Sequence, residues 1–88
     1  MAAFIVTYDL KKENKRENIT GHLKKRYSTW AMLSESSYAI TTKHSPEQVF
    51  KYMKPMLDGN DQLYVITLAD PHCGFGPVDI NEWLERNL

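Results

Sequence analysis

The stretch Ala3-Phe4-Ile5-Val6-Thr7-Tyr8-Asp9 decides the fold. Most of its side chains are aromatic or β-branched, and the run is too short for a helix. Because apolar residues occupy both alternating faces, we expect a central strand over residues 3–9. Asp9 ends this strand at the edge of a basic segment, and segments at the ends of strands often carry function. Asp9 is therefore the first candidate for a functional residue.

Helical spacing follows the strand over residues 14–27. Asn14 and Glu17 lie three positions apart, which fits a capping box at a helix start. Ile19, Leu23 and Tyr27 then recur every four residues along one face. Lysines and arginines occupy the outer face of this predicted helix.

A second strand-rich region covers residues 29–34 and 36–42, whose two halves flank a polar centre at Ser34-Glu35-Ser36. This pattern predicts a tight hairpin or a bulged strand pair.

The segment Ser45-Pro46-Glu47-Gln48 is typical of a helix start. Ser45 caps the helix, Pro46 takes the first turn, and Gln48 completes a capping box. Pro55 is expected to kink or tighten the last turn. The predicted buried stripe consists of Val49, Phe50, Met53 and Leu57.

The remainder of the chain predicts a turn, a strand and a short final helix. Residues 58–61 form the turn, residues 62–68 are the clearest strand, and residues 70–77 form a loop. Asp79 with Glu82 is expected to cap the final helix. That helix carries the apolar residues Ile80, Trp83 and Leu84.

The order of elements matches the split β-α-β unit of ferredoxin-like domains. We therefore expect an α+β, ferredoxin-like βαββαβ sandwich with a four-stranded antiparallel sheet and a C-terminal tail helix. One domain spans residues 1–88, with its core in residues 3–68 and a loop and helix in residues 69–88. Both helices should cover one face of the sheet and leave the second face open. The candidates for that open face are Tyr8, Trp30, Tyr38 and Tyr64.

Length and composition indicate one small domain. The chain has 88 residues, 42% of them apolar, which is near the lower limit for a self-sufficient core. No run approaches the roughly 20 apolar residues of a membrane span, and no signal-peptide pattern begins the chain. We expect a cytoplasmic protein without a membrane partner. The single Cys73 excludes an internal disulfide, and with His72 it offers only two adjacent metal ligands.

The charge is balanced in total but not in distribution. A net charge of zero argues against the bulk attraction of a dedicated nucleic-acid binder. Six of the eleven acids follow Leu57, whereas seven of the eleven basic residues lie between Leu10 and Tyr27. These charges form either two solvated or mutually attracting faces, or a local phosphate-binding patch. The residues of this basic segment are Lys11, Lys12, Lys15, Arg16, Lys24, Lys25 and Arg26.

Several short motifs resemble the smaller CRISPR-associated adaptation protein, a ferredoxin-like homodimer. They are Tyr8-Asp9, Ser36-Ser37-Tyr38 and the run from Asp61 to Ile66.

Almost the full length is similar to small uncharacterised bacterial and phage relatives of that family. The similarity rests on Trp30, the run from Lys54 to Asp61, and Trp83-Leu84. Virulence-associated protein D, an endoribonuclease-like protein, belongs to the same wider group.

The resemblance implies a homodimer in which the aspartate after the first strand binds a divalent metal opposite its counterpart. Asp9 is the matching residue. Two opposed carboxylates suit Mg²⁺, which prefers oxygen ligands and keeps bound water. The alternative is that Asp9 caps the following turn with its side chain. Members of the family also serve as non-catalytic scaffolds.

Two functions follow. The first is a non-catalytic homodimer that contacts RNA, DNA or an acidic protein and uses Trp83 and Leu84 in its interface. The alternative is a Mg²⁺-dependent endoribonuclease with Asp9 from both subunits. In it, the phosphates are held by Lys11, Lys12, Lys15 and Arg16. Neutral charge and an incomplete site favour the first, and no small-molecule cofactor is expected.

Overall fold

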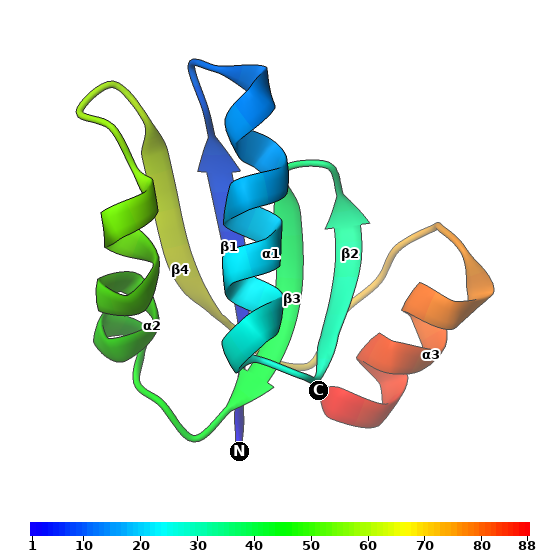
Figure 1. The fold of residues 1–88 in the computed structure, drawn as a ribbon. Coiled ribbons are helices and arrows are strands. Elements are labelled where there is room, and N and C mark those ends of the chain that lie inside the picture. The colour runs from blue at the N-terminus through cyan, green and yellow to red at the C-terminus, as the bar shows by residue number, and fades with distance from the viewer.

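The computed structural model describes residues 1–88, with the exception of the side chain of Glu13. The strands and helices follow one another in the predicted ferredoxin-like order, βαββαβ, followed by a tail helix (Figure 1). The elements are β1 (Ala2–Asp9), the 3₁₀ turn η1 (Glu13–Lys15), α1 (Arg16–Arg26), β2 (Trp30–Ser34), β3 (Ser37–Thr42), α2 (Pro46–Met53), the 3₁₀ turn η2 (Lys54–Met56), β4 (Gln62–Leu68) and α3 (Val78–Asn87). No described helix is long and apolar enough to cross a membrane.

The four strands form one antiparallel sheet in the order β2-β3-β1-β4. This arrangement confirms the α+β, ferredoxin-like prediction. β1 lies between β3 and β4, as its two apolar faces predicted. β2 and β3 form the predicted hairpin, and their pairing is irregular between Met32 and Ser34.

The core lies between one face of the sheet and the helices α1 and α2 (Figure 1). Phe4, Val6 and Tyr8 project from β1 toward these helices, because side chains alternate along a strand. The predicted helical stripe of α1 is confirmed, since all three of its apolar residues are buried. His22 of α1 stacks on Tyr52 of α2, with ring centroids 3.9 Å apart.

The second face of the sheet carries α3 over β2 and β3. Trp83 packs against Ala31 and Ala39 of its own chain, so α3 docks in cis. The prediction that four aromatic residues share this face is wrong for three of them. Tyr64 alone lies there, whereas the helix-side cluster contains Tyr8, Tyr38 and the partly buried Trp30. The strand period places the last three on the helix side.

The predicted capping box at the start of α1 is absent. Lys15 occupies the N-cap with helical dihedral angles and makes no side-chain cap hydrogen bond. Asn14 lies within η1, so it does not have the extended conformation that a capping side chain needs. The 3₁₀ turn has taken the place of a side-chain cap.

The start of α2 confirms its prediction. Ser45 accepts a hydrogen bond from the Gln48 backbone, and the Gln48 side chain accepts one from the Ser45 backbone. In the predicted buried stripe, Val49 and Met53 are buried and Leu57 is partly buried, whereas Phe50 is exposed. The last turn tightens into η2, which contains Pro55, as predicted.

The predicted cap of α3 is wrong. The helix begins at Val78 with Pro77 as the N-cap residue, and no side chain caps it. Asp79 lies instead in the first turn, where a negative charge interacts favourably with the helix dipole.

Candidate functional site

Asp9 lies at the end of β1 with its side chain exposed to solvent. It pairs with Gln62 of β4 and shares the second face of the sheet with Thr7 and Tyr64. No hydrogen bond or ion pair to its carboxylate occurs among the residues that the structure describes. The turn-capping role considered for Asp9 is therefore not observed.

Two solvent-facing hollows adjoin Asp9. The larger, of about 300 Å³, is lined by Tyr8, Asp9, Leu10, Arg16 and Ser36. The smaller, of about 120 Å³, lies on the sheet face and is lined by Thr7, Tyr8, Asp9, Gln62 and Tyr64.

The polar neighbours of Asp9 in the larger hollow are held by the turn between β2 and β3. The Tyr8 hydroxyl donates to the Glu35 carbonyl at 3.0 Å, and Arg16 contacts the Glu35 carboxylate at 3.2 Å. Burial, together with the nearby Tyr38, raises the pKa of Tyr8 to about 12. The phenol therefore stays protonated near neutral pH and is a hydrogen-bond donor rather than a base.

A different aspartate stabilises the loop that follows β1. Asp61 accepts hydrogen bonds from the backbone N–H of Lys11 at 3.0 Å and from that of Asp58 at 2.8 Å. It also binds the Lys15 ammonium group, which contacts Asp58 at 2.9 Å. Asp61 thus joins the loop after β1 to the turn before β4, and we call Lys15, Asp58 and Asp61 the loop clamp.

The clamp shifts the pKa values of Asp61 and Lys15. The hydrogen bond from Lys15, followed by those from the two backbone groups, holds the pKa of Asp61 well below its usual range. Hydrogen bonds to Asp61 and Asp58 raise the pKa of Lys15. The ammonium group of Lys15 is therefore held by two carboxylates of its own chain. At this residue, the basic segment and the acidic C-terminal part attract each other, which is one of the two alternatives predicted from the sequence.

The seven predicted phosphate-binding residues do not form one patch. Lys11 and Lys12 are exposed beside Asp9, whereas Lys15 and Arg16 are paired with carboxylates. The other three lie in the last turn of α1. There Lys24 sits 4.3 Å from the centroid of the Trp30 ring, Lys25 is exposed, and Arg26 contacts His44.

No group of three or more His, Cys, Asp or Glu residues able to hold a metal occurs among the described residues. Among the residues that the structure describes, Asp9 is the only carboxylate that lines either hollow. A Mg²⁺ ion fits the oxygen chemistry of the Asp9 carboxylate, because it is commonly bound by one or two carboxylates and keeps several waters.

Beside Asp9, half of the second face of the sheet is uncovered. On β4, Tyr64 is 59% exposed and Ile66 is 53% exposed. Ile5 of the neighbouring strand β1 is partly buried. Ile5 pairs with Ile66, so the three residues form one continuous surface, which we call the open strip. The sequence predicts only Tyr64 of these three residues for this face, because Ile66 resembles an ordinary core residue until the position of α3 is known.

The predicted interface residues Trp83 and Leu84 both contribute to the contact between α3 and its own sheet. Trp83 is buried and Leu84 is partly buried beside it. Any interface role of this pair stays a prediction.

No protein-family model and no curated protein matches the sequence significantly. Among solved structures, a hypothetical protein from Thermus thermophilus is similar, with a TM-score of 0.66 and 22% sequence identity. The match covers 88% of this chain and 95% of the other. The similarity supports the fold: this chain is an α+β domain with a four-stranded antiparallel sheet of the ferredoxin-like kind.

Proposed function

We propose that the chain acts as a homodimeric module that associates with nucleic acid and lacks efficient catalysis. The observation that carries the proposal is the open strip. Tyr64 and Ile66 expose large side chains on a sheet face that α3 covers only in part. Adjoining exposed apolar side chains of this kind are typical of interaction sites.

A second copy of the chain fits this surface best. Asp9 is the only charged residue among the side chains that β1 and β4 place on this face, and it lies at the end of both strands. An uncharged surface offers no electrostatic attraction to a polyanion. A two-fold contact would lay the open strip on itself, which satisfies the self-complementarity of a symmetric dimer. Such a dimer would also bring the two Asp9 ends of the sheets to one interface.

Nucleic acid would then meet the rim of the dimer. Lys11 and Lys12 are exposed directly after Asp9, and neither ion-pairs with a carboxylate among the described residues. Dimerisation doubles the number of these ammonium groups, which supports contact with phosphates. The larger hollow beside Asp9 contains no histidine in its lining, so it lacks the usual group for proton transfer near neutral pH.

The substitution Ile66→Lys tests the dimer. A lysine buried without a partner at the two-fold contact is expected to raise the dimer dissociation constant by on the order of 100-fold. Sedimentation equilibrium over a range of concentrations measures this change. Thr67→Lys adds the same charge one residue along β4, on the opposite side of the strand, and should leave the dissociation constant within about twofold.

Equal dimerisation of both variants would remove the basis of the proposed dimer, and so would a monomeric wild-type protein at millimolar concentration. Binding to a fluorescent single-stranded RNA is measured separately. Ile66→Lys should bind this RNA more weakly than Thr67→Lys, which carries the same added charge, because the monomer presents half as many copies of Lys11 and Lys12 to one strand.

One observation favours the endoribonuclease as a second candidate: the Asp9 carboxylate is exposed, adjoins a polar hollow, and has no partner among the described residues. Mg²⁺ held by Asp9 from each subunit would supply Lewis acidity and an activated water. Asp9→Asn is then expected to reduce RNA cleavage at least about 100-fold with the fold and dimer intact. Asp79→Asn, an exposed change on α3, serves as the control. Cleavage by Asp9→Asn at the wild-type rate rejects this candidate.

A further inference from the structure

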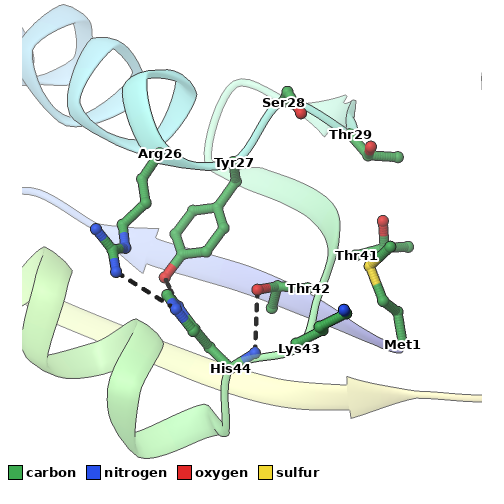
Figure 2. Close-up of a pocket in the computed structure, with 9 residues that line it drawn as sticks. All are labelled: Met1, Arg26, Tyr27, Ser28, Thr29, Thr41, Thr42, Lys43 and His44. Carbon is green, nitrogen blue, oxygen red and sulfur yellow. Dashed lines mark hydrogen bonds between the residues drawn. The ribbon is translucent and has the colours of Figure 1, made fainter.

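Another pocket, separate from the two hollows beside Asp9, lies at the opposite end of the sheet, where α1 ends and β3 leads into α2. Its volume is about 460 Å³. Figure 2 shows that Arg26, Tyr27 and His44 converge on one side, with hydroxyl-bearing residues on the other. The pocket is lined by Met1, Arg26, Tyr27, Ser28, Thr29, Thr41, Thr42, Lys43 and His44.

Hydrogen bonds fix the orientation of the basic side of this pocket. Nη2 of Arg26 lies 3.4 Å from Nε2 of His44, and the Tyr27 hydroxyl lies 3.1 Å from Nδ1 of His44. A neutral imidazole with its proton on Nδ1 satisfies both contacts, because it donates to Tyr27 and accepts from Arg26. The backbone N–H of His44 donates to the Thr42 hydroxyl at 3.1 Å, which holds the corner of the chain.

The charge of this pocket is not neutralised. Its lining contains Arg26 and Lys43 but no carboxylate, and neither residue forms an ion pair with any carboxylate among the described residues. This contrasts with Lys15 and Arg16 at the other end of α1, where each is paired with an acid. The pocket at the C-terminal end of α1 therefore contains two basic side chains that are not paired with a carboxylate of the described residues. In the hollow beside Asp9, by contrast, Arg16 is paired with Glu35.

A purely structural role explains only part of this arrangement. Arg26 lies in the last turn of α1, where a cation stabilises the negative end of the helix dipole. However, Arg26 extends to His44 at the β3–α2 corner (Figure 2). The helix dipole of α1 also does not account for Lys43 or for the hydroxyl groups around it.

We propose that this pocket binds a phosphate group. The guanidinium of Arg26 offers the planar fork that suits phosphate oxygens, and Lys43 adds a second positive charge. Hydroxyls of Ser28, Thr29 and Thr41 supply neutral donors on the opposite side. The volume lies within the range of small-molecule sites, so a nucleoside can accompany the phosphate. All these residues come from one chain, and the site therefore does not depend on the proposed dimer.

Titration with inorganic phosphate, followed by amide NMR shifts at constant ionic strength, tests the site. We expect saturable shifts confined to residues 26–29 and 41–44. Arg26→Gln with Lys43→Gln should weaken binding about tenfold or more, because charged hydrogen bonds to the phosphate are lost. Lys51→Gln with Lys54→Gln removes two exposed lysines outside the pocket and should leave binding within about twofold. Thermal melts confirm that both double variants are folded.

Competition identifies the source of the phosphate. A terminal phosphate is the ligand if a mononucleotide displaces inorganic phosphate from the pocket. The same holds if an oligonucleotide displaces it only when the oligonucleotide carries a 5′-phosphate. Equal displacement by the same oligonucleotide with a 5′-hydroxyl assigns the nucleic-acid backbone. Either result supports the site. The absence of saturable shifts, or equal weakening in the control double variant, overturns it.

Discussion

Asp61→Asn is expected to lower Tm by on the order of 10 °C, although it alters a single atom of a loop residue. The Asp61 side chain is only 1% exposed and accepts two backbone N–H groups as well as the Lys15 ammonium. An asparagine of the same size places an NH₂ group against at least one of these donors. The connection between the loop after β1 and the turn before β4 is then weakened. Thermal unfolding followed by circular dichroism measures the change.

Asp58→Asn is the matched control, because it removes the other carboxylate that contacts Lys15. Asp58 is 62% exposed, so its ion pair is screened by solvent, and Tm should fall by no more than about 2 °C. Similar losses for the two variants would show that Asp61 acts only as a surface charge.

The loss of Tm caused by Asp61→Asn depends on pH, and the pKa shifts of Asp61 and Lys15 set the direction of this dependence. The pKa of Asp61 is lower in the folded state than in the unfolded state. Asp61 therefore contributes its full stabilisation of the fold above the unfolded-state pKa of about 4, and this stabilisation is lost as the pH falls through the folded-state pKa. The pKa of Lys15 is raised, so its contribution is present below about 10.5 and is lost above that. The difference in Tm between the wild type and Asp61→Asn should therefore be greatest between these limits and should narrow in acid.

The sequence predicts the fold well where a local pattern coincides with the final contact. β1 was placed at the centre of the sheet because its run is apolar on both faces, and Ser45 begins α2 with the expected capping box. Predictions failed where a helix start depends on the preceding chain. η1 replaced the expected cap of α1, and Pro77 replaced that of α3.

The candidate sites were less predictable, because they depend on contacts between distant segments. Lys15 belongs to the basic segment that predicts phosphate contacts, yet it is paired with Asp58 and Asp61, which lie more than forty positions away. The phosphate pocket joins the end of α1 to the segment after β3, and no single motif spans both. Asp9 was identified directly, since the end of a strand can be recognised locally.

Trp83→Ala is expected to detach α3 while the main core stays folded. Trp83 is 7% exposed and is the only buried residue of α3, where it packs on Ala31 and Ala39. Truncation of a buried tryptophan costs about 3–5 kcal/mol, and a ten-residue helix is marginal without tertiary contacts. Amide hydrogen exchange in α3 should therefore accelerate by on the order of 100-fold or more. The core beneath α1 and α2 does not include Trp83, so its exchange should change little.

The same variant separates a role within the chain from a role between chains. If Trp83 acts through its own sheet, detachment of α3 uncovers Ala31 and Ala39 and enlarges the exposed apolar face beyond the open strip. Association of the chains should then no longer be confined to one defined dimer. If Trp83 instead contacts a partner subunit, dimer affinity should fall while α3 keeps its exchange protection. Glu82→Ala, on the exposed side of α3, controls for a loss of side-chain volume without burial. α3 therefore sets the boundary of the open strip. Its cluster with Ala31, Ala39 and Leu68 leaves the strip of Ile5, Tyr64 and Ile66 as the part of this face that a second copy can cover.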